Sequence, residues 1–529
     1  MGATPGLTER EVDADDTRRY WPVVGSLLLL ALVTCIALFQ MLSSTGGRLI
    51  YVLDDTYISM AIAKHFAELG VWGVTPYEFT SASSSPLWPL LLAATYRLVG
   101  TNEQAPWLLN FGFCVLLVCF IAWALRRELV NSWLIGAVIA VVVISAPMHT
   151  LVFVGLEHSA HALLTVVFAY QASIVLDRSA TTSWLFSLPS WLVTAALLCG
   201  TRYEAVALVA VVAGLLLLRG AWLMALAVMI AGAAPLVIYG AISVYHGNYW
   251  IPNPLLLKTD LLKAEDVGLG LGLAVSLVQR LVVNVLLGAH LVALLLALFL
   301  CATVFHLAFA RMGYFYRYEA YLVVLGLFSL GLWSSEIWHQ VVLRGMTIRE
   351  LTTRHLPAGL LLVVCACVSL RGAAILVRGE VGKAAQNIYE QQYQTGLFLN
   401  AHYSGEAVAL NDIGAANFLA DLRCLDLLGL ASVDVTTAML EQEMTAERST
   451  DIVRARGVRI VLVNPYYLPG LHPLPNGLVR SGVWRLPSAF VVADDEVVFY
   501  GTSEAEAARL RRNLQEFERR LPAGVMSGA

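Results

Sequence analysis

The sequence predicts a polytopic α-helical membrane protein with about 11 transmembrane helices, followed by a C-terminal soluble α/β domain. Of its 529 residues, 58% are hydrophobic and 14% are charged, and the mean hydropathy is +0.70. A soluble globular protein carries about a quarter charged residues. Several apolar runs are long enough to cross a hydrocarbon layer of about 30 Å as helices. After Glu380 the composition changes to that of a soluble domain.

Charge and cysteine content exclude two other classes of protein. The net charge is −4 and no run of lysine and arginine could follow a phosphate backbone, so we expect no nucleic-acid partner. Seven of the eight cysteines lie in apolar segments, where cysteine behaves as a small buried hydrophobe, so no disulfide framework is implied. Four of the 34 basic residues are lysines, which makes each lysine near the membrane a candidate for a special role.

Arginines set the predicted orientation, because cytoplasmic loops are enriched in lysine and arginine. Residues 1–20 are polar, contain Arg10, Arg18 and Arg19, and are predicted to be a cytoplasmic N-terminal segment. The apolar run at 21–42 has no small-residue cleavage site behind a short apolar core. It is therefore interpreted as a retained anchor rather than a signal peptide.

The first span leads to a predicted outer loop at residues 43–105. Within this loop, residues 86–99 are apolar but short, contain two prolines and come just before the next span. This stretch is predicted to be a helix that lies along the outer surface.

Ten further spans complete a predicted transmembrane module at residues 21–378. In this arrangement most loop arginines fall on the inner side and the C-terminus lies outside. The spans are predicted at about residues 106–125, 132–148, 157–176, 184–200, 203–218, 221–243, 269–287, 289–310, 319–334 and 355–376.

Residues 379–529 are predicted to form a periplasmic or extracytoplasmic α/β domain, whose size of about 150 residues is typical of one domain. Runs of β-branched and apolar residues predict its strands, and helical periodicity predicts its helices. The strands are expected at 408–410, 458–463 and 497–500, and the helices at about 413–421, 446–456 and 503–520.

Charged residues gather on the predicted outer side. Asp54 and Asp55 stand in the first outer loop, directly before an amphipathic stretch at 56–69. Two adjacent carboxylates at a membrane surface can supply a general base. The alternative is that one of them caps the start of the following helix. Both roles can hold, one for each aspartate.

Two further charged pairs lie at span ends on the same side. Glu157 and His158 start the fourth span, where they either bind a metal ion, with Asp54 as a further weak candidate, or lie at the interface. No third ligand stands at a fixed spacing, so the metal signal is weak. Arg202 and Glu204 lie between the fifth and sixth spans and are either substrate-binding residues or a snorkelling interfacial pair.

Two outer loops combine aromatic residues with a cation. Residues 248–258 contain Asn253 and Lys258, and a second aromatic loop contains Arg317 and Tyr318. Such cations suit a lipid-linked phosphate, and aromatic faces suit sugars; the alternative is a plain aromatic belt. Charges at span ends rather than at the midplane favour an enzyme acting on a charged lipid headgroup over a pore.

A series of short motifs follows the chain in a fixed order. They are Asp54-Asp55-Thr56-Tyr57-Ile58-Ser59, Thr80-Ser81-Ala82-Ser83-Ser84-Ser85-Pro86-Leu87-Trp88, Gly155-Leu156-Glu157, Thr201-Arg202-Tyr203-Glu204, Pro252-Asn253-Pro254 with Lys258, Arg317-Tyr318, Asn411-Asp412-Ile413-Gly414 and Asp426-Leu427-Leu428-Gly429-Leu430. As a set, they resemble the GT-C glycosyltransferases. More closely, they are similar to the branch that contains the mycobacterial terminal arabinofuranosyltransferases. The resemblance extends over residues 20–430.

This resemblance implies a transferase that uses a polyprenyl-phosphate sugar as donor at the outer membrane face, with an acidic residue of the first outer loop as the base. Asp54 matches the catalytic position better, and Asp55 is then the expected helix cap. The sequence departs from its relatives at Tyr203, where they usually have Pro or Asp, and at residues 254–257, which replace a Thr-Phe-Tyr-Ala run. The candidate donor- and substrate-binding residues are Glu157, His158, Arg202, Glu204, Asn253, Lys258, Arg317 and Tyr318.

The leading hypothesis is an inverting glycosyltransferase of the bacterial inner membrane with its active site on the periplasmic face. Lys258, with Arg202 or Arg317, would hold the phosphate of the donor. A divalent cation, Mg or Mn, bound to the same phosphate is an alternative that the sequence leaves open. The sugar, arabinofuranose by the resemblance, would pass to a glycan, lipid or protein acceptor. No Gly-rich nucleotide loop is visible. The alternative is a secondary transporter or flippase of lipid-linked sugars, although paired hydropathy repeats and midplane charges are not found.

Overall fold

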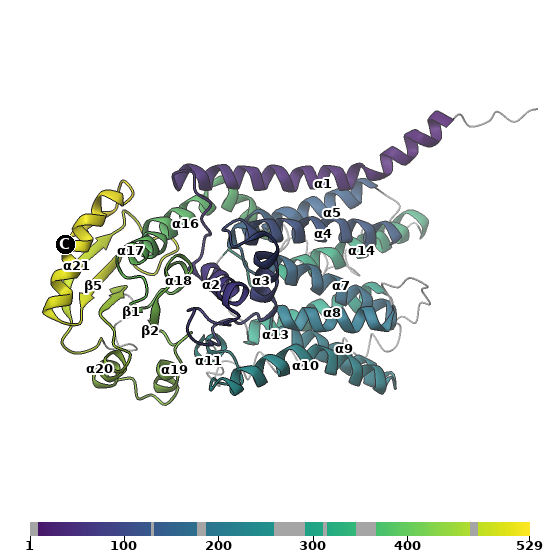
Figure 1. Ribbon diagram of the computed structural model, residues 1–529. Coiled ribbons are helices and arrows are strands. Elements are labelled where there is room, and N and C mark those ends of the chain that lie inside the picture. The colour runs from purple at the N-terminus through teal and green to yellow at the C-terminus, as the bar shows by residue number, and fades with distance from the viewer. Residues whose placement is uncertain are drawn as a thin grey trace, which may run out of the picture.

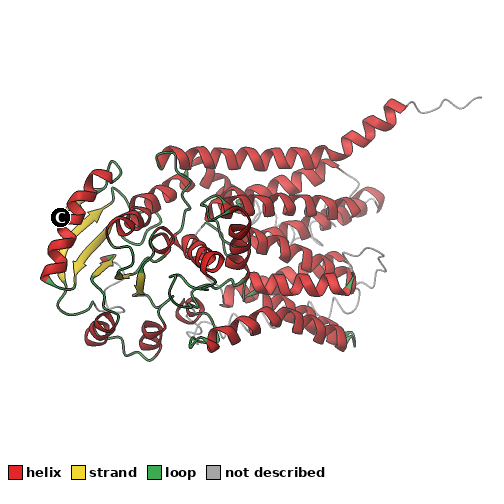
Figure 2. Cartoon of the chain, viewed as in Figure 1, coloured by secondary structure: helices red, strands yellow, loops and turns green. Residues whose placement is uncertain are grey.

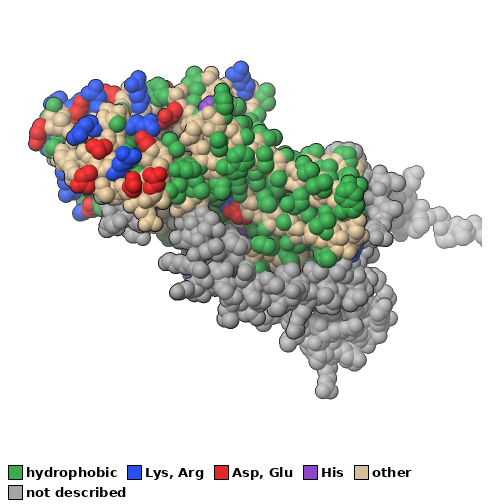
Figure 3. All heavy atoms as spheres, turned by 90° about the horizontal axis from the view of Figure 1, so that it is seen from below, with side chains coloured by type: hydrophobic (Ala, Val, Ile, Leu, Met, Phe, Trp, Pro, Cys, Tyr) green, Lys and Arg blue, Asp and Glu red, His purple; other side chains and the backbone are tan. Residues whose placement is uncertain are grey.

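The computed structural model is a bundle of long helices with a mixed α/β domain at one end (Figure 1). It describes residues 9–128, 132–176, 187–258, 291–309, 315–344, 367–465 and 474–528. The strands lie together at one end of the molecule, beyond the bundle (Figure 2). On the face seen in Figure 3, hydrophobic side chains cover the bundle, and acidic and basic side chains cover the C-terminal domain. This division is expected for a membrane-embedded bundle joined to a domain in water.

The bundle is built from apolar helices, because helix formation satisfies every backbone polar group where water is absent. Its described members are α1 (Glu9–Ser44), α4 (Ala105–Glu128), α5 (Ser132–Ser145), α6 (Met148–Val154), α7 (His158–Leu176), α8 (Leu188–Thr201), α9 (Ala205–Leu218), α10 (Trp222–Tyr245), α13 (Leu291–Phe309) and α14 (Ala320–Arg344). A further apolar helix at Cys367–Val377 precedes the C-terminal domain. Phe153, Phe168, Trp191 and Phe328 fill the core between these helices.

The described helices differ in their ability to cross a membrane. Four are long and apolar enough, namely Tyr20–Ser44 of α1, Ala105–Arg127 of α4, α7 and α10, and the bent pair α5 and α6 is a fifth if it counts as one span. Helices α8 and α9 have 14 residues each, which gives about 21 Å. The predicted span at 269–287 and most of the one at 355–376 lie outside the described residues. The total of about 11 spans therefore stays a prediction.

One predicted span is bent. The sequence predicts a single span at 132–148, but α5 and α6 meet at an angle of 41°. Pro147 stands at the break, where it has no N–H to donate and disfavours a helical residue before it. The bend leads to Gly155, whose φ is 68°, and a Cβ there would lie 2.5 Å from the ring of Tyr51 and 2.7 Å from Thr56. Because residue 155 is glycine, the loop at residues 43–105 can pack closely against the end of α6.

Two shorter helices, α2 (Asp54–Leu69) and α3 (Leu87–Val99), lie at the end of the bundle that faces the C-terminal domain (Figure 1). The structure confirms a helix at residues 86–99 and places it beside α2. Arg97 donates a hydrogen bond to the carbonyl of Ala67 at 2.7 Å, which joins the two helices. Most of α2 is buried, so this part of the first outer loop is a packed element between bundle and domain.

The C-terminal domain begins with one continuous helix, formed by α16 (Glu380–Ile388), the π-helical η2 (Tyr389–Tyr393) and α17 (Gln394–His402). Its sheet has the strand order β2-β1-β3-β5-β4-β6. Strands β2, β1 and β3 are parallel, and β5, β4 and β6 are added antiparallel. The strands are β1 (Ala407–Leu410), β2 (Arg423–Asp426), β3 (Ile460–Val463), β4 (Val479–Arg485), β5 (Glu496–Gly501) and β6 (Met526–Gly528). Phe398 of α17 packs on Trp484 and Phe499 of the sheet.

The predicted strands at 408–410, 458–463 and 497–500 are confirmed as β1, β3 and β5. The predicted helices are confirmed as α18 (Gly414–Leu419), α20 (Ala446–Ala455) and α21 (Glu504–Phe517), which is followed by a short 3-10 turn at Glu518–Arg520. The elements that were not predicted are β2, β4, β6, α19 (Val433–Leu440) and the helix formed by α16, η2 and α17. Strands β2 and β6 are too short for a pattern, and β4 is irregular between Arg480 and Gly482.

The C-terminal domain docks on α2 through α18. Gly414 begins α18, and a Cβ at this position would lie 2.1 Å from the carbonyl oxygen of Asp54 and 2.8 Å from its Cγ. A backbone oxygen cannot move aside as a flexible side chain can, so the two helices meet this closely because the residue is glycine.

Gly414→Ala is expected to weaken this docking. The added methyl group presses on the backbone of Asp54, and overpacking of this kind costs about 1–3 kcal/mol. The Tm of the protein in detergent should fall, and a protease should release the C-terminal domain more readily. Gly214→Ala is the matched control, because no atom lies within 4 Å of a Cβ there. An unchanged Tm for Gly414→Ala would contradict the close contact between α18 and α2.

Candidate functional site

Asp54 and Asp55 lie in the first turn of α2. The helix begins at Asp54, and its N-cap is Leu53, whose side chain cannot accept a hydrogen bond. The prediction that Asp55 caps this helix is therefore wrong, because the chain becomes helical one residue too early for that role. Two consecutive helical residues point about 100° apart, so the aspartates face different neighbours.

The Asp54 carboxylate holds the start of α18. Its Oδ2 accepts a hydrogen bond from the N–H of Gly414 at 2.7 Å, and its Oδ1 accepts one from the N–H of Ala415 at 2.8 Å. Burial and the nearby charge of Asp412 raise the pKa of Asp54, whereas the two N–H bonds lower it. The net pKa is raised. Asp54 therefore connects the two parts of the molecule and is also a candidate base.

Asp55 faces a buried arginine. Its Oδ2 lies 3.0 Å from Nη2 of Arg317, and 36% of its side chain is exposed, compared with 5% for Arg317. The same nitrogen donates to the hydroxyl of Tyr318 at 2.6 Å, and the guanidinium lies 4.6 Å from the centre of the Tyr318 ring. Asp55 thus combines access to solvent with a cation beside it.

The backbone that leads to Arg317 is strained. Phe315 and Tyr316 have φ values of 65° and 57°, in the left-handed region. Side chains with a Cβ occupy this region at a cost of roughly 1–2 kcal/mol each. Strain of this kind concentrates at functional sites, and here it immediately precedes the arginine that contacts Asp55.

A second arginine, Arg202, is held between two carboxylates. Glu157 accepts a hydrogen bond from it at 2.8 Å, and Glu204 accepts two, at 2.6 and 3.2 Å. Its guanidinium also lies 5.2 Å from the centre of the Tyr318 ring. Burial raises the pKa of Glu204, but the ion pair with Arg202 outweighs burial and lowers it to about 2. Two acidic side chains therefore neutralise Arg202.

The weak metal candidates have other neighbours in the structure. Asp54 accepts two backbone N–H groups, Glu157 binds Arg202, and the His158 ring packs edge-on against Tyr318 at 5.7 Å. Within the described residues, no group of three or more His, Cys, Asp and Glu side chains could hold a metal ion.

The loop with Asn253 lies against both the first outer loop and the C-terminal domain. Asn253 begins α11 (Asn253–Lys258), is fully buried and donates its N–H to the carbonyl of Ser81 at 3.0 Å. The hydroxyl of Tyr249 lies 2.8 Å from that of Thr437. Lys258 ends α11, but its side chain is outside the described part of the chain, so its contact with a phosphate stays a prediction.

The structure brings most of the predicted site residues together at one end of the bundle. One contact network joins Asp55, Glu157, His158, Arg202, Glu204, Arg317 and Tyr318. The sequence reading did not foresee that Asp412 and Gly414 of the C-terminal domain adjoin Asp54. The motif that contains both residues directly follows the predicted strand at 408–410. Polar residues just after a strand of an α/β domain often belong to a binding site, and this was the signal that could have indicated their position.

Residues 386–500 match a family model described as a domain of unknown function, DUF8728. No curated protein sequence matches the chain. Among solved structures, the chain is similar to the crystal structure of ArnT from Cupriavidus metallidurans bound to undecaprenyl phosphate. The identity is 13%, the match covers 90% of this chain and 98% of that chain, and the TM-score is 0.48.

Arg202→Met is expected to destabilise the protein in a pH-dependent way. Removing one partner of a buried ion pair costs about 3–5 kcal/mol, because a charge stays buried without its counterion. In the wild type the lowered pKa of Glu204 means that its ion pair stabilises the fold above the unfolded pKa of about 4.3 and is lost as the pH falls toward 2. Without Arg202, burial alone raises the pKa of this carboxyl group, so acidification should stabilise the variant.

The measurement is Tm in detergent between neutral pH and pH 4, where the deficit of Arg202→Met should shrink as the pH falls. Arg219→Met is the matched control. Arg219 lies at the other end of α9 and has no ion pair within the described residues. A Tm deficit that is the same at every pH would show that Arg202 does not act through its charge.

Proposed function

We propose that the protein is a GT-C glycosyltransferase that moves a sugar, with inversion, from a polyprenyl-phosphate donor to a hydroxyl group of an acceptor. The pairing of Asp55 with Arg317 carries this proposal, because an exposed carboxylate stands 3.0 Å from a buried guanidinium where apolar helices meet a polar domain. A lipid-linked phosphate requires the cation, and a hydroxyl nucleophile requires the carboxylate as its base. The order of the motifs along the chain supports the same class.

Arg317 is proposed to change partners when the donor binds. A phosphate offers the guanidinium more charge and more acceptor oxygens than a carboxylate does. Once Arg317 binds the phosphate, the Asp55 carboxylate loses its ion pair and becomes free to accept the proton of a hydroxyl group. Donor binding would therefore prepare the base before the acceptor reacts.

The reaction then needs no covalent intermediate with the protein. Asp55 accepts the proton of the acceptor hydroxyl, whose oxygen attacks the anomeric carbon from the face opposite the phosphate. The bond between the anomeric carbon and the phosphate oxygen breaks, and the polyprenyl phosphate leaves with the electron pair. Arg317 stabilises the negative charge that develops on the leaving phosphate.

This assignment gives the two aspartates roles opposite to those inferred from the resemblance. Both oxygens of Asp54 accept N–H groups of α18, so protonation of Asp54 would compete with domain docking. Asp55 has the exposed side chain and the neighbouring cation. Arg202, neutralised by Glu157 and Glu204, is proposed to position Tyr318 rather than to bind the phosphate.

The substrates and location follow the sequence-based hypothesis. Arabinofuranose is the sugar that the resemblance implies, and the acceptor is a glycan, lipid or protein of the cell envelope. The active site is proposed to face the periplasm from the bacterial inner membrane, with the donor arriving among the membrane lipids. A flippase of lipid-linked sugars is the competing function, and it would move the donor without forming a glycosidic bond.

Asp55→Asn is the decisive test of the chemistry. Asparagine keeps the size of the side chain but cannot act as a base at neutral pH. Transfer from a radiolabelled polyprenyl-phosphate sugar should therefore be abolished, while the Tm and donor binding stay close to the wild type. Asp54→Asn should instead lower the Tm, because one of its oxygens is replaced by an NH₂ group that cannot accept an N–H from α18.

Either of two results would contradict this pair of assignments. If Asp55→Asn retains wild-type turnover and Asp54→Asn is folded but inactive, the base is Asp54. If the wild type translocates the lipid-linked sugar between leaflets but forms no glycosidic product with any acceptor, the transferase proposal is wrong and the flippase is favoured.

Lys258→Ala is expected to weaken donor binding about tenfold or more, because it removes a charge-assisted contact worth roughly 1.5–3 kcal/mol. Lys383→Ala is the control, since Lys383 is exposed in α16 of the C-terminal domain. Binding of the polyprenyl-phosphate sugar in nanodiscs measures both. Equal affinity of the two variants for the donor would assign Lys258 to the membrane interface alone.

A further inference from the structure

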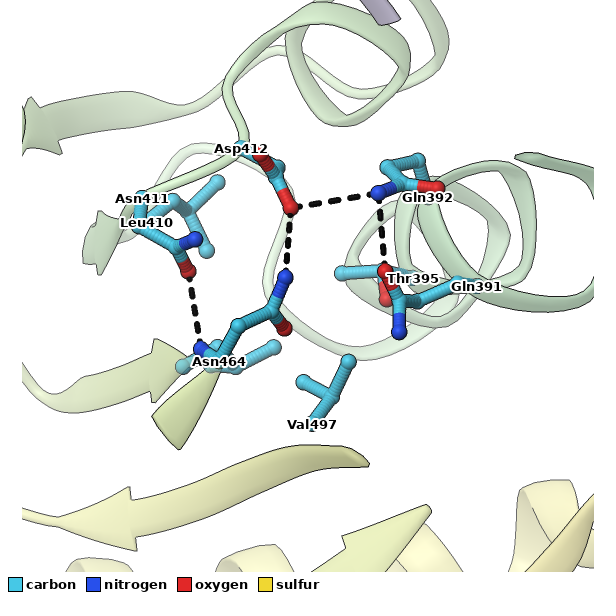
Figure 4. Close-up of a pocket in the computed structure, with 9 residues that line it drawn as sticks. Gln391, Gln392, Thr395, Leu410, Asn411, Asp412, Asn464 and Val497 are labelled. Atoms are coloured by element: carbon cyan, nitrogen blue, oxygen red, sulfur yellow. Dashed lines mark hydrogen bonds between the residues drawn. The ribbon is translucent and has the colours of Figure 1, made fainter. Parts of the chain in front are cut away.

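A small pocket lies in the C-terminal domain, where β1 and β3 end (Figure 4). The π-helical η2 and the start of α17 cover its other side. The pocket holds a volume of about 20 Å³. That volume is enough for one water molecule or one hydroxyl group.

Hydrogen bonds fix the polar side chains of the pocket in position. Asp412 Oδ2 accepts hydrogen bonds from Nε2 of Gln392 at 3.1 Å and from Nδ2 of Asn464 at 2.9 Å (Figure 4). The N–H of Asn464 donates to Oδ1 of Asn411 at 3.1 Å. The exposed fractions of Gln392, Asn411 and Asn464 are 6%, 6% and 1%. These side chains are therefore pre-organised and nearly removed from solvent.

Two polar atoms in this set lack a partner. Within the described part of the chain, Nδ2 of Asn411 and Oε1 of Gln392 are buried and make no hydrogen bond. The first is a donor and the second an acceptor, and leaving such groups unsatisfied costs free energy. A donor such as Nδ2 matches a hydroxyl oxygen, and an acceptor such as Oε1 matches a hydroxyl proton.

The charge of the residues that line the pocket indicates which class of ligand the pocket can bind. Asp412 is the charged residue among the nine that line the pocket, and Leu410, Leu462 and Val497 supply an apolar part. The carboxylate repels a phosphate or another anion. A neutral ligand with a hydroxyl or hydroxymethyl group next to a small apolar face, as in a sugar, matches both halves of the lining.

The position of the pocket connects it with the proposed chemistry. Asp412 stands two residues before Gly414, whose N–H binds Asp54. The carboxyl ends of parallel strands are also the usual place where α/β domains bind ligands. In addition, the π-helical turn brings the consecutive residues Gln391 and Gln392 to the same pocket, and π-turns are frequent at functional sites.

We propose that this pocket is a hydroxyl-binding subsite for a neutral sugar, and that, given the proposed transferase function, it holds a hydroxyl group of the acceptor beside Asp54 and Asp55. The domain of unknown function would thereby contribute a sugar-recognition site to the enzyme.

The test measures binding of neutral sugars to the full-length protein in nanodiscs. The probes are methyl pyranosides and methyl furanosides at millimolar concentrations, detected by saturation-transfer NMR, with inorganic phosphate as the anionic control. Val497→Leu adds a methylene group that fills the pocket without touching its hydrogen bonds. Val498→Leu is the matched control, because Val498 is the next residue of β5 and does not line the pocket.

Asn411→Asp provides a second variant with a different physical effect. It keeps the oxygen that accepts the N–H of Asn464, but it replaces the unpartnered donor by a second negative charge. At least one methyl glycoside is expected to bind the wild type and Val498→Leu equally, and to bind Val497→Leu and Asn411→Asp about tenfold more weakly or not at all. Inorganic phosphate should not bind this pocket.

Two outcomes would overturn the subsite: no methyl glycoside binds the wild type, or Val497→Leu and Asn411→Asp bind the same glycosides as tightly as the wild type does. Neither readout depends on a lipid-linked donor. Loss of sugar binding in the pocket variants of a protein that transfers no sugar would therefore reject the proposed function alone. Transfer with wild-type acceptor KM in both pocket variants would reject the subsite alone.

Discussion

Two hydrogen bonds, donated by the N–H groups of Gly414 and Ala415 to the Asp54 carboxylate, join α18 to α2 where the two parts of this molecule meet. They fix α2, which belongs to the first outer loop, against the C-terminal domain, and the contact is close because Gly414 has no side chain. The orientation of α2 in turn directs the neighbouring Asp55 toward Arg317. The Asp55–Arg317 ion pair and the residues Asp412 and Gly414 of the C-terminal domain thus lie close to this one carboxylate.

The two buried arginines at the end of the bundle differ in the number and the exposure of their acidic partners. Arg202 is buried between two glutamates, and its charge is fully balanced. Arg317 is equally buried but pairs with an aspartate that solvent can reach. Tyr318 stands between the two guanidinium groups and keeps them apart with its ring. A fully buried ion-pair cluster and a partly exposed ion pair therefore lie side by side, with Tyr318 between them.

Much of the architecture could be predicted because its signals are local. Apolar runs gave the helices of the bundle, and β-branched runs gave β1, β3 and β5. The residues of the ion-pair network could be named because charge near a membrane is unusual. Their partners could not, since the bonds from the N–H of Gly414 to Asp54 and from Arg317 to Asp55 join residues hundreds of positions apart. The helix cap was misassigned because the cap depends on the exact residue at which α2 begins.

The unbroken helix through α16, η2 and α17 has a mechanical consequence. It runs from Glu380 to His402 and extends for roughly 35 Å. The Arg371–Glu380 ion pair fixes one end, Tyr393 bonds Glu103 at 3.0 Å near the middle, and Phe398 is embedded in the domain core near the other end. Because one unbroken helix carries these three contacts, it couples the position of the domain core to that of Glu103. Under the proposed function, a lipid donor would reach the junction of the two parts from the plane of the bilayer, and a water-borne acceptor would reach it from the flank of the domain.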